Sequence, residues 1–133
     1  MYTILFKYVI IFPVHNMELE ILEYLKNNDG TFERCTNGLY LDDEITYDIE
    51  DYSMHINPLK HIMIRESKDY KYIFDLDNSS LKCILKNDDL DLDMDLNIID
   101  MNITNDIIYL KYYVSDSDDN VIEYKLTCTA KKN

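Results

Sequence analysis

Hydrophobic and polar residues alternate along most of the chain after Met17. The clearest case is LDLDMDLNIID at residues 90–100, where an extended strand would carry apolar residues on one face and aspartate or asparagine on the other. After Ile98 the alternation slips by one residue, so that Ile99 and Met101 continue the apolar set. A single slip is typical of a β-bulge, which bends a strand and increases its twist. We therefore predict a bulged strand with one apolar face.

Shorter alternating runs lie between polar breaks. The sequence predicts strands at 17–25, 31–36, 45–52, 60–66, 70–76, 81–86, 90–103, 107–114 and 121–130. The leucine spacing of 17–25 also fits a helix, but the Asp-Gly that follows favours a hairpin. We expect a second turn at Asn37-Gly38, and a loop or poor edge strand at 53–59 because this segment contains Pro58. About nine strands with short connections and no convincing helix predict an antiparallel meander, a closed barrel or a sandwich.

The chain length bounds the domain organisation. The 133 residues fit one domain, which we expect at 17–133, preceded by an N-terminal extension at 1–16. The apolar part of that extension is too short to span a bilayer, and it lacks the basic region and cleavage site of a signal peptide. It is either an additional strand or sequence upstream of the natural start. We therefore expect a cytoplasmic protein.

The charge is strongly negative, with 26 acidic residues, 13 basic residues and a net charge of −13. Binding to nucleic acid requires basic residues that face phosphates, so we expect no nucleic-acid partner and no docking on an anionic membrane. The charge either keeps the protein soluble through self-repulsion or attracts a basic protein partner.

Metal, cofactor and disulfide chemistry are not indicated. Cys35, Cys83 and Cys128 are scattered and odd in number, as expected for reduced thiols in the cytoplasm. The aspartates from residue 89 onward have the spacing of a calcium loop, but Met94 stands where that loop needs glycine. We interpret this aspartate row as the solvated face of a strand and expect no metal and no cofactor.

Catalytic motifs are also missing from the sequence. His15, His55 and His61 lie in no motif, and Gly30 and Gly38 are the only glycines, so a glycine-rich phosphate loop cannot be built. The sequence favours a protein that is not an enzyme.

Arg65 is one of two arginines and lies in the otherwise apolar run IMIRES. It is either a strand-end arginine in water or paired with a carboxylate, or it is a polar anchor at a barrel mouth that faces a ligand carboxylate or phosphate. The many tyrosines either pack in the core and rim or line a ligand pocket. Arg65, Tyr47 and Tyr112 are our candidate ligand-binding residues.

From Met17 onward the chain resembles the YwiB-like family of small bacterial proteins, whose domain of unknown function has a calycin-type, lipocalin-like β-barrel fold. TFERCTNGLYL at 31–41 resembles the opening hairpin of the family, and IIYLKYYVSDSDDNVIEYKLTCT at 107–129 resembles its terminal hairpin with Tyr112 in the tyrosine position. Arg65 and Phe74 resemble its apolar-Arg strand and the phenylalanine that follows. The resemblance implies an all-β, calycin-like barrel of about eight or nine strands, closed or nearly closed, and a natural start close to Met17. It supplies no catalytic residues.

Two functional hypotheses follow. The first is a small cytoplasmic β-barrel that binds a small apolar or anionic ligand in its interior. The alternative is an acidic protein-interaction module, such as an immunity protein, an inhibitor or a nucleic-acid mimic, that uses its negative surface. Carboxylates concentrated on one face would favour the second, and carboxylates spread around the barrel would favour the first.

Overall fold

The computed structural model describes residues 16–131, and every regular element in this range is a β-strand. The predicted extension at 1–16 lies, except for Asn16, outside the described residues. The strands are β2 (Asn16–Asn27), β3 (Gly30–Leu41), β4 (Glu44–Ile49), β5 (Tyr52–Asn57), β6 (Ile62–Glu66), β7 (Tyr70–Asp75), β8 (Ser80–Leu85), β9 (Leu90–Ile103), β10 (Ile107–Val114) and β11 (Ile122–Ala130). The prediction of an all-β fold is confirmed.

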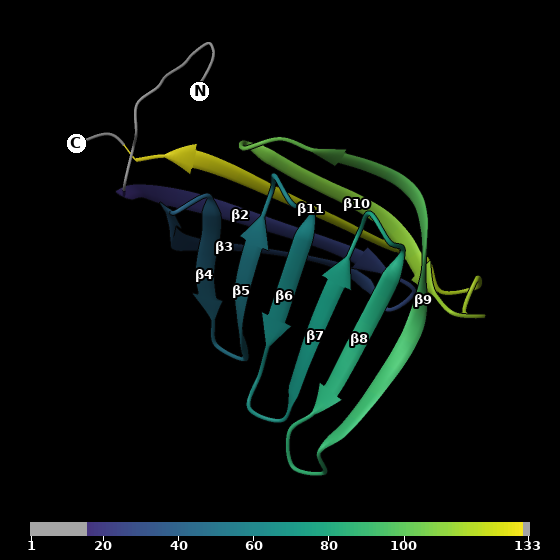
Figure 1. Cartoon of the computed structure of the whole chain (residues 1–133). Coiled ribbons are helices and arrows are strands. Elements are labelled where there is room, and N and C mark those ends of the chain that lie inside the picture. Colours follow the sequence, from purple (N-terminus) through teal and green to yellow (C-terminus); the bar gives the residue numbers. More distant parts are fainter. Residues whose placement is uncertain (1–15, 132–133) are drawn as a thin grey trace.

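The strands form a closed antiparallel barrel in the order β10-β11-β2-β3-β4-β5-β6-β7-β8-β9, with β9 returning to pair with β10. Each strand therefore pairs with its neighbours in the sequence, and β11 pairs with β2 to close the ring. The predicted meander is confirmed, with ten strands in place of eight or nine. Figure 1 shows the short strands β4 to β8 side by side, with the longer strands β2, β3, β10 and β11 crossing them.

Three sequence predictions were wrong. The strand predicted at 45–52 ends at Ile49, and Tyr52 begins the next strand after a turn at 50–51. The segment expected as a loop or poor edge strand contains β5, which pairs with β4 on one side and β6 on the other. Pro58 follows the last residue of β5, so it interrupts no ladder hydrogen bond. Asn37-Gly38 is not a turn but part of β3, where a Cβ atom on Gly38 would lie 2.7 Å from the carbonyl oxygen of Thr46. This glycine therefore permits a close approach of two strands.

The predicted slip in β9 is a β-bulge. Tyr112 of β10 pairs with Ile98, and Lys111 pairs with Asp100, so Ile99 has no partner in this register. Ile99 is 51% exposed, which places the extra residue outside the core. Figure 1 shows β9 curving from the lower end of the short strands to a position beside β10. The bend in β9 thus allows this strand to pair with β8 along its first part and with β10 along its second part.

The apolar core fills one end of the barrel. At this closed end the turns lie at 42–43, 58–61, 76–79 and 104–106, and the inward side chains of Ile45, Ile56 and Ile108 are fully buried. The other end, which we call the mouth, carries the connections at 28–29, 50–51, 67–69, 86–89 and 115–121. The barrel is therefore packed at one end, and the site described next lies between that core and the mouth.

Candidate functional site

The strand register shows which side chains face the barrel interior. Directly opposed residues on neighbouring strands share a face of the sheet. Met54 of β5 is buried in the core and pairs with Arg65 of β6, which pairs with Tyr72 of β7. The same row continues to Cys83 and Leu92. Arg65 is therefore an inward-facing residue, as its candidate role requires.

The guanidinium of Arg65 stacks on an aromatic ring but leaves a buried donor without a partner. Its Cζ atom lies 4.8 Å from the centre of the Tyr52 ring, a cation–π distance. The Arg65 Nε–H group is buried and donates a hydrogen bond to no partner among the described residues. A buried polar atom without a partner costs free energy, so a ligand oxygen that accepts a hydrogen bond from this donor would be stabilised.

Beside Arg65 lies a polar network centred on Glu23 of β2. The carboxylate is only 5% exposed, and it accepts hydrogen bonds from the hydroxyl of Tyr47 at 2.5 Å and from that of Tyr52 at 2.6 Å. The Tyr47 hydroxyl also lies 2.6 Å from that of Tyr124. Because both carboxylate oxygens have a phenol partner, the buried charge is partly compensated. The network joins β2, β4, β5 and β11 across the interior.

The protonation of these tyrosines is shifted by their surroundings. Burial, followed by the neighbouring Tyr124 and Glu23, raises the pKa of Tyr47 above its ordinary value. Burial and the hydrogen bond to Glu23 raise the pKa of Tyr52, and burial also raises that of Tyr124. All three phenols therefore keep their protons at neutral pH and serve as hydrogen-bond donors.

Tyr112, the third predicted residue, is buried on β10. Its ring packs edge-on against Phe74 at a centroid distance of 5.9 Å. Burial raises the pKa of Tyr112, while the charge of Arg65 acts in the opposite direction. The structure thus places Arg65, Tyr47 and Tyr112 on the inner face, with Tyr47 linked through Glu23 to the Tyr52 ring beneath Arg65.

Glu23, Tyr52 and Tyr124 were not predicted as site residues. The signal for Glu23 was present, since alternation in MELEILEYL puts it on the same face as Leu19 and Ile21. An acid in an apolar row marks either a buried polar network or a register error. The segment was correctly predicted as a strand, but the acid on its apolar face was not recognised as a site residue.

An uncovered apolar surface lies between Arg65 and the mouth. The strand register gives the direction of its side chains. Phe32 pairs with inward-facing Leu25, and Leu92 pairs with buried Cys83. Leu85 pairs with both Tyr70 and Leu90, so these three side chains also face the interior. Yet four of these inward-facing side chains are exposed: Phe32 by 46%, Tyr70 by 42%, Leu90 by 46% and Leu92 by 44%. We call the set Phe32, Tyr70, Leu85, Leu90 and Leu92 the open inner face.

The outer surface has two hollows, and Tyr47 of the network is among the residues that line one of them. One, of about 520 Å³, lies over β2 to β5 and is lined by residues that include Glu18, Leu39 and His55. The other, of about 710 Å³, lies over β9, β10, β11, β2 and β3. In the second hollow a hydrogen bond to Glu123 raises the pKa of Tyr109 to about 12.

The described residues contain no group of three or more histidine, cysteine, aspartate or glutamate side chains placed to hold a metal ion. Asp91, Asp93 and Asp95 are exposed on the outer face of β9. Between residues 16 and 131 there is also no helix long and apolar enough to cross a membrane.

Comparison of the chain with protein-family models, curated proteins and solved structures finds no match. The resemblance to the YwiB-like family therefore stays a prediction, and the function has to be argued from the site itself.

Proposed function

We propose that the protein is a small-molecule-binding β-barrel that holds the anionic group of an amphipathic ligand at Arg65. The observation that carries this proposal is the buried Arg65 Nε atom, which has no hydrogen-bond partner among the described residues and faces inward. A guanidinium offers five donors in a planar fork, which matches a carboxylate or phosphate. An anion bound there would satisfy the buried donor and form charge-assisted hydrogen bonds.

The open inner face supports an apolar body for this ligand. Leu92 lies in the same register row as Arg65, and Leu90 and Phe32 lie further toward the mouth. Ligand sites in proteins combine mainly apolar walls with a few placed polar groups. A ligand with its charged end at Arg65 and its apolar end toward the mouth would cover this surface.

The remaining features of the proposal concern setting and chemistry. We place the protein in a bacterial cytoplasm, which is supported by the resemblance and by its three free cysteines. We assign it a binding role without catalysis, because the Glu23 network consists of phenols and a carboxylate that bind one another. The lipocalin-like classification of the barrel belongs to the same proposal.

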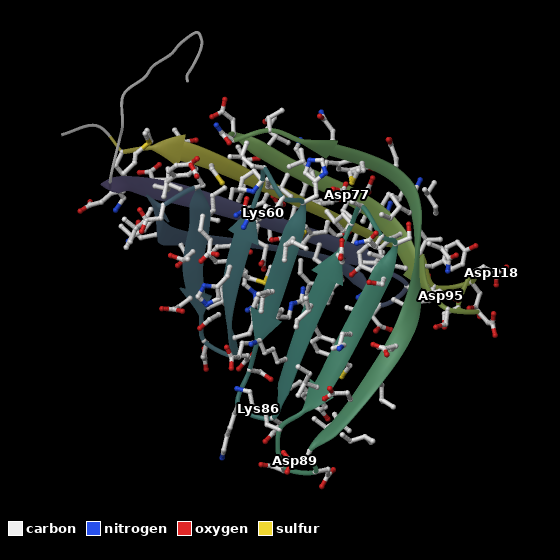
Figure 2. All side chains as sticks on the ribbon, viewed as in Figure 1. Lys60, Asp77, Lys86, Asp89, Asp95 and Asp118 are labelled. Carbon is white, nitrogen blue, oxygen red and sulfur yellow. The ribbon has the colours of Figure 1, made fainter. Side chains whose placement is uncertain are left out.

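The alternative proposal is an acidic protein-interaction module. Its main support is the net charge of −13. However, the acids are spread widely: Figure 2 shows Asp77 near the top of the view, Asp89 at the bottom, and Asp95 and Asp118 together at the right. A nucleic-acid mimic would need one continuous acidic face, so the distribution favours the ligand-binding barrel.

Native mass spectrometry of the full chain, purified without detergent, tests the proposal. We expect a reproducible adduct that carries an anionic group and that is lost in Arg65→Met but retained in the surface variant Lys86→Met. An adduct that persists in Arg65→Met would contradict the assignment of Arg65 as the anchor.

A further inference from the structure

One strand of the barrel has a free edge. Every residue of β3 pairs with β2, from Gly30 to Leu41. On its other side β3 pairs with β4 only through Gly38 to Leu41. The backbone groups of 31–37 that point away from β2 therefore have no strand partner among the described residues. Barrel closure normally removes such edges, so this one is an exception within the fold.

The free edge is also uncovered on both faces. Thr31, Phe32, Glu33, Arg34 and Cys35 are all exposed. Leu25 pairs with Phe32 and Glu23 with Arg34, so Phe32 and Arg34 face inward, while Thr31, Glu33 and Cys35 face outward. A strand added here would thus present alternate side chains to the open inner face and to the outer surface.

The edge is regular enough to accept a partner strand. Native proteins block exposed edges with proline, bulges or very short strands. Residues 31–37 contain no proline, and the pairing of β3 with β2 has no register shift. The charges of Glu33 and Arg34 remain, and we expect them to select among partners, because cross-strand pairs of opposite charge stabilise and like charges destabilise.

We infer that the β3 edge at residues 31–37 binds an extended, basic segment of a partner protein as an additional strand. Glu33 is exposed, and three exposed acids, Asp48, Glu50 and Asp51, lie where β4 ends beside this edge, since the Thr36 hydroxyl donates a hydrogen bond to the Asp48 carbonyl oxygen. A basic side chain opposite Glu33 would therefore meet a net negative surface. A second copy of the chain is disfavoured as the occupant, since each copy carries a net charge of −13.

This mode of binding makes a specific prediction about the backbone. In strand addition, main-chain hydrogen bonds supply affinity and alternate side chains supply specificity. The interaction shares Phe32 with the open inner face but does not use Arg65, so it should persist in Arg65→Met.

The test uses a fluorescein-labelled peptide of alternating lysine and valine, with its affinity for the full chain measured by fluorescence anisotropy. N-methylation of the alternate amides that face β3 should weaken binding at least about tenfold, because it removes the ladder hydrogen bonds. N-methylation of the other amides should change affinity less than about twofold. Amide hydrogen exchange at residues 31–37 should slow when the peptide binds.

Charge reversal provides the matched protein variants. Glu33→Lys should lower the affinity for the lysine peptide by about threefold to tenfold, and it should raise the affinity for a peptide with glutamate in place of lysine. Asp93→Lys, at an exposed residue on the outer face of β9, makes the same change in net charge far from β3 and should leave both affinities nearly unchanged. Failure of the lysine peptide to bind, equal effects of the two N-methylation patterns, or equal effects of the two charge reversals would each overturn the inference.

Discussion

The hydroxyl of Tyr47 on β4 donates a hydrogen bond of 2.5 Å to the carboxylate of Glu23 on β2, across the intervening strand β3. The bond lies inside the barrel, where both residues are almost fully buried. A barrel that only filled its interior with side chains would have no need of an acid at this place. The Glu23 network therefore forms a polar layer between the apolar core and the open inner face.

The Glu23 network should respond cooperatively to substitution. Tyr47→Phe should lower the free energy of unfolding by about 1–3 kcal/mol, because it removes a donor from Glu23 and a partner from Tyr124. Glu23→Leu should cost about 2–5 kcal/mol, since the buried phenol of Tyr47 and the partly buried phenol of Tyr52 lose their acceptor. Urea unfolding measures both values.

The combined variant is the stronger test of this network. Glu23→Leu with Tyr47→Phe and Tyr52→Phe should be more stable than Glu23→Leu alone, because no phenol is left facing a missing carboxylate. Tyr70→Phe, at an exposed tyrosine, should change stability by less than about 0.5 kcal/mol. Additive losses in the combined variant would show that the three groups do not act together.

Alkaline pH should destabilise the fold. The pKa values of Tyr47, Tyr52 and Tyr124 are raised in the folded state above the ordinary value of about 10. Below pH 10 these phenols are protonated in both states, so their contribution is complete. Above it the unfolded chain loses protons first, and stability should fall by about 1.4 kcal/mol per pH unit for each of the three.

Urea unfolding across the alkaline range measures this slope, and absorbance of tyrosinate follows the titration. Tyr47→Phe should reduce the slope by the contribution of one tyrosine. If all tyrosines of the folded protein ionised near pH 10, the buried network would be ruled out.

The bulge in β9 predicts opposite effects at two apolar residues. Ile99→Asp should change the free energy of unfolding by less than about 0.5 kcal/mol, because Ile99 is 51% exposed. Leu96→Asp should cost more than about 4 kcal/mol, because it would bury an unpaired charge in the core. Equal effects of the two substitutions would contradict the register around the bulge.

The thiols should differ in reactivity. Cys35 is exposed, whereas Cys83 and Cys128 are buried, and burial raises the pKa of Cys128 to about 12. A disulfide reagent at neutral pH should therefore modify one thiol rapidly in the folded protein and all three after unfolding. Cys35→Ser should remove the rapid phase, and a rapid phase that survives this substitution would contradict the burial of the other two.

The sequence predicted the fold well where a strand has one wet face. In β9 the alternation of outward aspartates and inward apolar residues predicted the strand, and the slip in this alternation predicted its bulge. β5 was missed because Pro58 suggested a break, although the proline lies just beyond the strand. Gly38 was misread as a turn because its real role, the close approach to Thr46, depends on a neighbouring strand.

The site was predicted only in part, for a similar reason. Arg65 stood out as a charged residue in an apolar strand, and it faces inward. Which tyrosines meet Glu23 depends on the order of strands around the barrel, since Tyr52 and Tyr124 come from β5 and β11. Local alternation assigns faces, but it does not bring distant strands together.

The central claim is that Arg65 anchors an anion above an apolar surface, and isothermal titration of the full chain with decanoate and with decanol tests it most directly. Decanoate should bind at least about tenfold more tightly than decanol, because charge-assisted hydrogen bonds to a buried guanidinium contribute about 1.5–3 kcal/mol. Arg65→Met should abolish the difference, while Lys86→Met, which removes a surface cation near the mouth, should preserve it. Equal affinities for the two probes in the unmodified protein, or a difference that survives Arg65→Met, would contradict the claim.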